Sequence, residues 1–309
     1  MDIIPPMPIT PANAALVSST VSEPDSTVGE VAWNSGTTYS TLGTEVTYQG
    51  FIYSNINITG NTNKPPLTNQ VTFWKQQRPT NRYTMFALDR NTKTTKSSGN
   101  LKVVIAPNQR CDSIALLGVD STSVLIEVKN SLGTVVFSYY EDLTKRNTTG
   151  WYSYYYGKFL NTPNVILHNL PPLLTVTIEV TITRGSNPSS IQALVLGMNE
   201  NIGILEYSSN SDSRNFSTMD RKTDGTAVLN PKRTVPTTNN KIAVPIAKIP
   251  QVRRLRDTLN AVPAVYSGLD DQVENGYFEL FLILGFYKGW KITPDDISYA
   301  TLDLPLEEV

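Results

Sequence analysis

Residues 175–183 read Thr-Val-Thr-Ile-Glu-Val-Thr-Ile-Thr, with apolar side chains at even positions and polar ones at odd positions. A period of two places each set on one face of a β-strand, so this run predicts a half-buried strand. Further apolar runs over 102–105, 113–118, 123–129 and 134–139 are separated by turn-forming residues, as in the Asn-Ser-Leu-Gly stretch at 130–133. Short strands with frequent turns are typical of a β-sandwich or jelly roll.

The balance of polar residues favours the same fold class. Only 17% of residues are charged, against roughly 25% in an average soluble protein, and Thr, Ser and Asn fill the difference. Thr suits a pleated surface, while Ser and Asn favour turns over helix interiors. With 26 basic and 27 acidic residues the net charge is −1, so we expect no nucleic-acid partner.

Changes of pattern along the 309 residues predict four segments. Residues 1–28, with five prolines, form an extended N-terminal arm. Residues 29–78 form a small aromatic-rich β module, residues 79–203 a central jelly-roll β-sandwich, and residues 204–309 a C-terminal α+β domain. The last holds one amphipathic helix over 251–262, because Val252, Leu255, Leu259 and Val262 recur at helical spacing. The fold class is therefore mainly β.

The sequence offers little for catalysis. It has one histidine, His168, and one cysteine, Cys111, which lies beside an apolar run and is expected to be a buried thiol. Common motifs for metal or nucleotide binding are absent, so we predict no catalytic residue, no metal and no cofactor. Paired carboxylates would still allow glycoside hydrolysis, at Asp270, Asp271 and Glu274 or at Asp295 and Asp296, but both groups lie in loop-like sequence.

No segment has the composition of a membrane anchor. The longest apolar stretch, 280–286, is far shorter than the roughly 20 residues that cross a bilayer. The first residues lack the basic and apolar regions of a signal peptide, so we expect folding in the cytoplasm.

The aromatic module resembles the small chitin-binding modules of carbohydrate-binding families five and twelve. The resemblance covers about 45 residues and rests on residues 31–39 (VAWNSGTTY), 43–53 (GTEVTYQGFIY), 65–66 (PP) and 73–75 (FWK), with a hairpin turn expected at Gln49-Gly50. It implies carbohydrate contact through stacked aromatic faces. The residues that it suggests for this role are Trp33, Tyr48, Tyr53 and Trp74.

The rest of the chain resembles a bacteriophage virion protein family in which a similar module precedes a jelly roll and a C-terminal domain. The resemblance rests on residues 151–156 (WYSYYY), 223–225 (TDG), 261–266 (AVPAVY) and 285–290 (GFYKGW). It implies a structural protein of the tail, in a ring, sheath or baseplate, assembled in the host cytoplasm. Its partners would be copies of itself in a homo-oligomeric ring, other virion proteins and host-surface glycan.

We therefore expect a non-enzymatic structural component of a phage tail that acts in virion assembly and host attachment. The alternative is a receptor- or glycan-binding protein that recognises host polysaccharide directly. A polysaccharide-degrading enzyme is the third reading and requires two facing carboxylates in a cleft.

Overall fold

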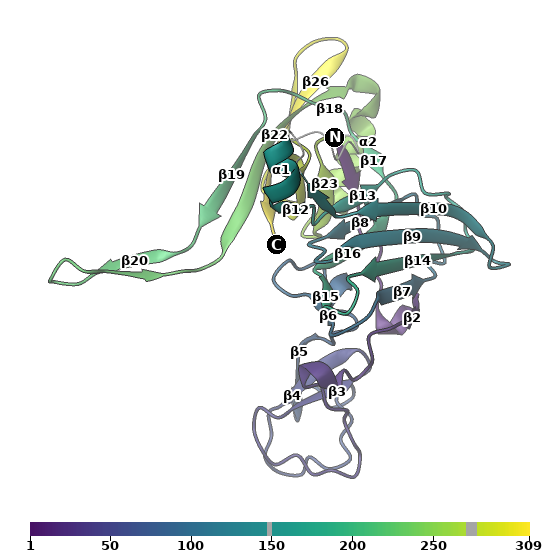
Figure 1. Ribbon diagram of the computed structural model, residues 1–309, viewed down its shortest axis with the longest axis vertical. Coiled ribbons are helices and arrows are strands. Elements are labelled where there is room, and N and C mark those ends of the chain that lie inside the picture. The colour runs from purple at the N-terminus through teal and green to yellow at the C-terminus, as the bar shows by residue number, and fades with distance from the viewer. Residues whose placement is uncertain (147–149, 270–276) are drawn as a thin grey trace. The chain divides into compact units, whose positions relative to one another are not determined.

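The computed structural model describes residues 1–146, 150–269 and 277–309, and confirms a mainly β fold (Figure 1). The α-helices among these residues are α1 (Trp151–Tyr156) and α2 (Ile249–Thr258). Short 3-10 helices are η1 (Pro11–Asn13), η2 (Ser26–Val28), η3 (Thr84–Phe86), η4 (Ile246–Lys248) and η5 (Glu279–Phe281).

The described residues form two compact units. One comprises Met1–Pro6, Ile166–His168 and Val195–Val309, and the other comprises Met7–Val165 and Asn169–Leu194. We call them the C-terminal unit and the central unit. Strands β13 (Val165–Leu167) and β16 (Ala193–Gly197) carry residues of both. The four-segment division made from the sequence stays a prediction.

The central unit is built on a five-stranded antiparallel sheet in the order β10-β9-β14-β7-β2, whose strands run side by side in Figure 1. The strand that carries the 175–183 pattern, β14, buries alternate residues as predicted. The Asn130–Gly133 turn joins β9 to β10, with the Gly133 amide donating to the Asn130 carbonyl. The strands of this sheet are β2 (Leu16–Ser19), β7 (Leu101–Ile105), β9 (Ser123–Asn130), β10 (Val135–Asp142) and β14 (Val176–Thr183).

Smaller ladders complete the central unit. Strand β8 (Ser113–Leu117) is buried along its whole length. Beside it in sequence, Cys111 is a free, buried thiol as predicted, and burial together with the neighbouring Asp112 raises its pKa to about 11. The remaining ladders pair β6 (Thr94–Lys96) with β15 (Ser189–Ile191), β11 (Thr144–Arg146) with β12 (Phe159–Asn161), and β3 (Glu45–Tyr48) with β4 (Phe51–Asn55) and β5 (Trp74–Pro79).

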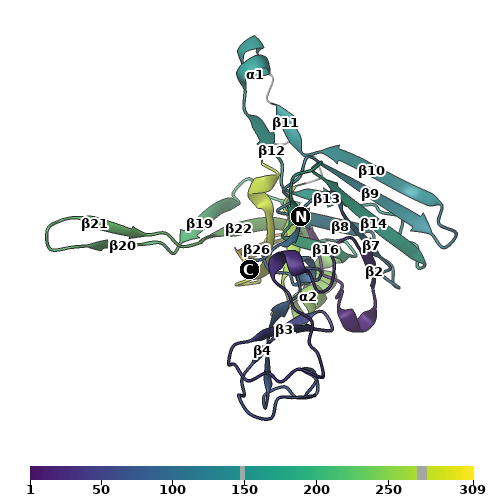
Figure 2. The same cartoon turned by 60° about the horizontal axis from the view of Figure 1, so that its bottom comes forward.

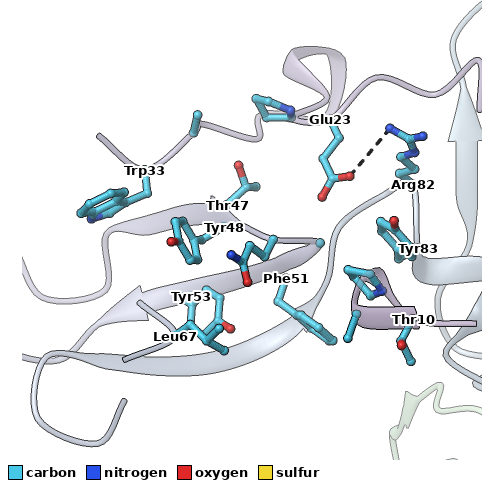
Figure 3. A pocket seen from close by; sticks show the side chains of 16 residues that line it. Thr10, Glu23, Trp33, Thr47, Tyr48, Phe51, Tyr53, Leu67, Arg82 and Tyr83 are labelled. Atoms are coloured by element: carbon cyan, nitrogen blue, oxygen red, sulfur yellow. Dashed lines mark ion pairs between the residues drawn. The ribbon is translucent and has the colours of Figure 1, made fainter. Parts of the chain in front are cut away.

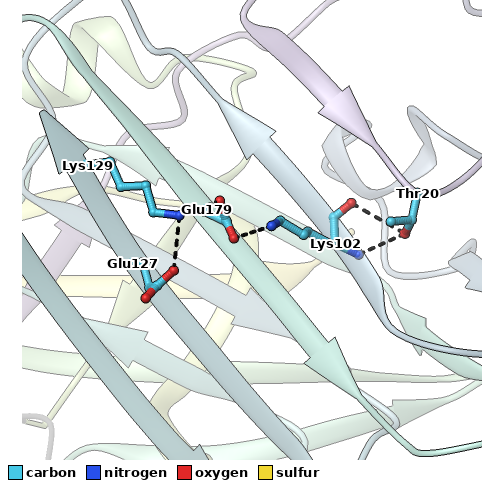
Figure 4. Close-up of polar contacts among 5 residues, drawn as sticks. All are labelled: Thr20, Lys102, Glu127, Lys129 and Glu179. Atoms are coloured by element: carbon cyan, nitrogen blue, oxygen red, sulfur yellow. Dashed lines mark hydrogen bonds and ion pairs between the residues drawn. The ribbon is translucent and has the colours of Figure 1, made fainter. Parts of the chain in front are cut away.

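The polar face of the five-stranded sheet carries a row of alternating charges (Figure 4). On β14, Glu179 pairs with Lys102 of β7 and, at 2.9 Å, with Lys129 of β9. The same Lys129 ammonium lies 3.3 Å from Glu127. At the edge of the sheet, the Lys102 backbone amide donates over 2.9 Å to the hydroxyl of Thr20, the residue that follows β2.

The C-terminal unit is built on a nine-stranded sheet in the order β17-β1-β23-β24-β26-β22-β18, with β19 also paired to β22 and β25 to β26. Helix α2 packs on it through Val252 and Leu255, which share a core with residues of the sheet, and Leu259 directly after the helix joins the same core. The helix spans 249–258 rather than 251–262, because Pro250 fits its first turn and Ala261 has a positive φ of 60° that ends helical geometry.

The strands of the nine-stranded sheet come from both ends of the chain. They are β1 (Asp2–Ile4), β17 (Glu200–Asn201), β18 (Ile204–Leu205), β19 (Asn210–Asn215), β22 (Thr234–Pro245), β23 (Ala264–Ser267), β24 (Leu282–Tyr287), β25 (Lys291–Pro294) and β26 (Tyr299–Glu308). Residues 1–28, expected as an arm, therefore supply β1 to this sheet and β2 to the central one.

A polar stretch without sequence alternation also folds as strands. Residues 208–240 contain β19, the start of β22, and a second ladder of β20 (Thr218–Arg221) with β21 (Ala227–Asn230). Every residue of β20 and β21 is exposed. Without a buried face, such strands leave no hydrophobic period to recognise.

In the part of the chain that the structure describes, we find no helix with the length and apolar character needed to cross a bilayer.

Removing one charge of the sheet row tests its contribution to stability. Burial acts to raise the Glu179 pKa, but hydrogen bonds from Lys102 and Lys129 outweigh it and hold the pKa below 4.5. The hydrogen bond to Glu179 raises the Lys129 pKa above 10.5. We expect Glu179→Gln to lower the free energy of unfolding at pH 7 by about 1 kcal/mol in urea denaturation.

The pH dependence of this stability loss follows from the lowered Glu179 pKa and the raised Lys129 pKa. A lowered carboxyl pKa stabilises the fold above 4.5 and loses that effect as the pH falls through the folded value, while a raised lysine pKa acts below 10.5. The deficit of Glu179→Gln should thus be full between these values and vanish in acid. Glu45→Gln, which breaks a more exposed pair with Arg78, is the control with a smaller loss. A Glu179→Gln deficit that persists in strong acid contradicts the ion-pair account.

Candidate functional site

The aromatic module is organised by a tight hairpin. Strands β3 and β4 pair Tyr48 directly with Phe51, and the two residues between them, Gln49 and Gly50, have positive φ angles of 48° and 79°. Positive φ at both central residues is the requirement of a type I′ turn, the two-residue connection that matches strand twist. The turn predicted at Gln49-Gly50 is therefore confirmed.

Two of the predicted sugar-contact residues form the core of this module. Tyr53 and Trp74 are fully buried, and the Trp74 ring meets Tyr39 edge to face at 5.1 Å between centroids. The Trp74 indole N–H donates to the Lys64 carbonyl over 2.8 Å. A small module has little other apolar material, so bulky rings supply most of its interior.

Buried side-chain amides connect Asn55 of β4 to residues 39–41 and to Asn61 beside this core. The side-chain amide of Asn55 donates to the carbonyls of Tyr39 and Thr41 over 3.1 and 2.9 Å, and accepts from the Asn61 amide over 2.6 Å. Both asparagines are buried, so these hydrogen bonds replace water for the loop backbone.

A second buried polar group ties residues 23–30 to residues 80–95. Asn81 is 5% exposed, its backbone N–H donates to Glu30 over 2.6 Å, and its side-chain amide donates to Asp25 over 2.6 Å. Burial acts to raise the Asp25 pKa, but hydrogen bonds from Thr27 and Asn81 leave it below its ordinary value. The carboxylate therefore stays ionised in its buried position.

Between these fixed parts lies a cavity of about 800 Å³, which we call the aromatic cleft. Its volume falls within the range of sites for small ligands. Its walls come from the β3–β4 hairpin with residues 32–33, from residues 10–12 and 23–24, from residues 82–83, and from Leu67. The lining residues are Thr10, Pro11, Ala12, Glu23, Pro24, Ala32, Trp33, Thr47, Tyr48, Gln49, Gly50, Phe51, Tyr53, Leu67, Arg82 and Tyr83.

The aromatic rings run across one side of the cleft (Figure 3). Trp33 and Tyr48 meet edge to face at 5.5 Å between centroids, and both are only partly buried. In Figure 3, Trp33 lies at one end of the group and Tyr83 at the other, with Tyr48 between them. The cleft therefore presents ring faces and edges at several points along its length.

A charged pair stands at the Tyr83 end. The Arg82 guanidinium lies 3.9 Å from the Glu23 carboxylate, a long separation for an ion pair, and both side chains are about one-fifth to one-quarter exposed, at 24% and 21%. Burial raises the Glu23 pKa, and the opposing effects of Arg82 and of the Thr80 hydrogen bond do not cancel it. These two side chains give the cleft a donor and an acceptor that a bound polar molecule can reach.

The structure brings together three of the four predicted site residues. Trp33, Tyr48 and Tyr53 line the cleft, although Tyr53 contributes from a buried position, whereas Trp74 is not among the lining residues. Sequence reasoning missed Glu23, Arg82 and Tyr83. All three residues lie outside the predicted module, residues 29–78, and reach the hairpin only through the fold. The aromatic side chain of Tyr83 was the one sequence signal for a role in sugar contact.

Asp295 and Asp296, the described carboxylates of the two candidate catalytic groups, are not among the lining residues. Asp295 and Asp296 are adjacent and exposed, and backbone hydrogen bonds from Ser298 and Tyr299 lower the Asp296 pKa. Asp270, Asp271 and Glu274 lie outside the described residues. Within the described ranges, no group of three or more His, Cys, Asp or Glu side chains is placed to hold a metal ion.

Comparisons with known proteins add one distant similarity. No protein-family model matches the chain, and no curated protein is significantly similar to it in sequence. Among solved structures, it is similar to a fucose-binding module from Streptococcus pneumoniae, with 13% sequence identity and a TM-score of 0.28. The similarity covers 38% of this chain and 83% of that module, and a TM-score this low does not establish a shared fold.

Gly50 offers a direct test of the cleft wall. A Cβ added there would lie 2.2 Å from Pro11 Cγ, whereas one added at Gly43, which has the same φ of 79°, would meet nothing within 4 Å. Both alanine variants carry the backbone strain of positive φ, about 1 kcal/mol. Only Gly50→Ala adds a collision, so we expect it to lose a further 1–3 kcal/mol, roughly, in urea denaturation. Equal losses in the two variants would show that the hairpin does not pack on Pro11.

Proposed function

We propose that this chain binds glycans through the aromatic cleft and does not transform them. One observation carries the proposal. Partly exposed aromatic rings and the partly buried Glu23–Arg82 pair line the same cavity of about 800 Å³. Pockets of this kind, apolar with a few convergent polar groups, are typical of small-molecule sites.

The chemistry of the lining fits a sugar. A pyranose ring presents C–H groups on one face and hydroxyls around its rim, so it can stack on an aromatic face and hydrogen-bond at its edge. Trp33, Tyr48 and Tyr83 supply aromatic surface, and Glu23 and Arg82 supply an acceptor and donors. A purely apolar ligand would form no hydrogen bond with Glu23 or Arg82.

The same lining favours binding over turnover. Of the described residues that line the cleft, Glu23 is the one carboxylate. Glycoside hydrolysis ordinarily needs two carboxyl groups that flank the scissile bond. We therefore propose recognition without hydrolysis, which agrees with the non-enzymatic expectation from the sequence.

A binding assay with matched variants tests this proposal. The protein is applied to an array of bacterial and animal oligosaccharides, and a bound oligosaccharide is then titrated by calorimetry. We expect Tyr48→Ala to weaken its affinity about tenfold, because one stacking surface is lost. Tyr140→Ala is the control, since Tyr140 is 61% exposed on β10 and lies outside the cleft lining.

Two results separate binding from folding. Far-ultraviolet circular dichroism should be unchanged in Tyr48→Ala, whereas Trp74→Ala removes a fully buried ring and should destabilise the module by about 3–5 kcal/mol. Unchanged affinity in both Tyr48→Ala and Trp33→Ala would count against the cleft as the binding site. Release of reducing sugar, lost in Glu23→Gln, would replace binding by hydrolysis.

We also propose a second role, as a structural component of a phage tail, and one observation favours the contact between subunits that this role requires. The β20–β21 ladder has no buried residue, and it sets Met219 opposite Leu229, which are 53% and 71% exposed. A two-stranded ladder alone is at best marginally stable in water. Contact with a neighbouring molecule would cover this apolar pair and the unpaired strand edges.

This proposal specifies an assembly of like subunits. Rings form when a patch on one copy contacts a different patch on the next and the rotation closes. We propose that the β20–β21 ladder, shown beyond β19 and β22 in Figure 2, makes such a contact in a homo-oligomeric tail component assembled in the host cytoplasm. Other virion proteins would be further partners.

Mass photometry of the purified chain tests the assembly proposal. We expect oligomers that dissociate on dilution and that are lost when residues 218–230 are replaced by a Gly-Ser turn, which leaves the β19–β22 ladder in place. Ile297→Ser is the control, because Ile297 is 93% exposed and is not part of the ladder. A strictly monomeric wild type at high concentration contradicts the proposal.

A further inference from the structure

The chain between β11 and β12 carries an exposed cluster of aromatic side chains. Helix α1 has the sequence Trp-Tyr-Ser-Tyr-Tyr-Tyr, and it caps the end of the β11–β12 ladder (Figure 2). We call residues 150–159 the aromatic tip. The exposed fractions of its rings are 80% for Trp151, 79% for Tyr152, 52% for Tyr154, 62% for Tyr155, 74% for Tyr156 and 60% for Phe159. None belongs to the core of the central unit.

The rings of the helix contact one another. Trp151 stacks on Tyr155 at 6.3 Å between centroids, and Tyr152 meets Tyr156 at 5.4 Å. Both pairs are four residues apart, the spacing that places side chains on the same side of a helix. Since successive residues turn by roughly 100°, the five rings spread over about 200° of the helix circumference, and Ser153 lies on the remaining side.

The polar side chain of the helix is engaged locally. The Ser153 hydroxyl accepts from the Gly150 N–H over 3.0 Å and donates to the Gly150 carbonyl over 2.8 Å. The Gly157 N–H donates to the Ser153 carbonyl over 2.9 Å at the other end. The tip therefore presents rings with phenol and indole groups to its surroundings.

The charged residue of the tip itself, Lys158, is basic. Residues 143–165 contain Lys145, Arg146 and Lys158 and no Asp or Glu, but Lys145 pairs with Glu141 of β10 over 3.3 Å, so the positive charge beside the rings comes from Arg146 and Lys158. Lys158 is exposed next to the rings. A local excess of positive charge beside aromatic rings is complementary to an anionic surface.

We propose that the aromatic tip inserts into the interfacial region of a lipid bilayer that contains anionic lipid. Trp and Tyr are enriched at the headgroup level, where the ring meets apolar chains and the N–H or O–H meets water. Lysine and arginine beside such a segment add attraction to anionic headgroups. The aromatic tip carries Trp, Tyr and Lys, the residue types that favour this layer, at the end of a short projection.

The wide arc that the rings cover favours a bilayer over a protein partner. A partner protein covers one face, so a helix that docks in a groove places its anchors on one stripe. Here the five rings form one cluster in which Tyr155 contacts Trp151, Tyr154 and Tyr156, and the cluster spreads over about 200° of the helix, wider than one stripe. A bilayer interface surrounds an inserted tip and contacts every ring. This inference does not depend on either proposed function above.

Sedimentation with lipid vesicles tests the inference. The full chain is mixed with vesicles of phosphatidylcholine alone or with added phosphatidylglycerol, and the bound fraction is measured. We expect binding that is stronger with phosphatidylglycerol. The quadruple variant Trp151→Ser, Tyr152→Ser, Tyr155→Ser and Tyr156→Ser should bind at least about tenfold more weakly, because membrane binding scales with buried apolar area.

Three further variants separate insertion of the tip from nonspecific adsorption to vesicles. Tyr207→Ser removes a fully exposed ring of the C-terminal unit and should bind like wild type. Lys158→Ser should bind about fivefold more weakly to anionic vesicles and equally to neutral ones, as expected for one lysine at the surface. Vesicles should also shift the tryptophan emission to shorter wavelength, and Trp151→Phe should lose that shift.

Several outcomes would overturn the inference. The wild type could fail to bind either kind of vesicle, or the quadruple variant could bind as well as the wild type. A third adverse outcome is that the quadruple variant loses self-association in mass photometry while vesicle binding is absent in both proteins, which would make a second copy the occupant. Circular dichroism and thermal unfolding confirm that each variant is folded, as expected from the exposure of these side chains.

Discussion

The hydrogen bonds of Asn81 determine whether the cleft exists. Its backbone N–H donates to Glu30, its carbonyl accepts from Thr94, and its side chain donates to Asp25 and to the Thr95 carbonyl and accepts from the Thr95 amide. Every polar group of one buried residue is thereby paired, which is the condition under which a buried polar network stabilises a unique arrangement. The network fixes residues 23–30 against residues 80–95, and so places Glu23 and Tyr83 opposite the hairpin.

The elements that could be predicted from the sequence are those specified by neighbouring residues. The alternation along β14, the turn at Gln49-Gly50 and the apolar spacing of α2 each depend on a short window of sequence. In each, the period of the backbone and the chemistry of the side chains agree. The mainly β fold class follows from the sum of such windows.

The cleft could not be predicted in full, because residues distant in sequence meet there. Glu23 and Arg82 become neighbours only through the buried network, and neither has a pattern that marks it as a site residue. The residues next to an aromatic ring in sequence likewise do not determine whether the ring is exposed. Trp33 lines the cleft, whereas Trp74 is buried by Tyr39 and by a loop held through Asn55. The exposed ladder of β20 and β21 left no hydrophobic period for the same reason that it has no core.

The pairing of β22 with β26 has a mechanical consequence. These strands are paired antiparallel from Thr237 with Glu307 to Pro245 with Tyr299, and β22 continues on its other side into the ladder with β19. A pull transmitted from residues 218–230 along β22 would load these hydrogen bonds in shear, many at once, rather than peel them apart one by one. The C-terminal unit would therefore resist tension along that strand far better than tension applied across the sheet.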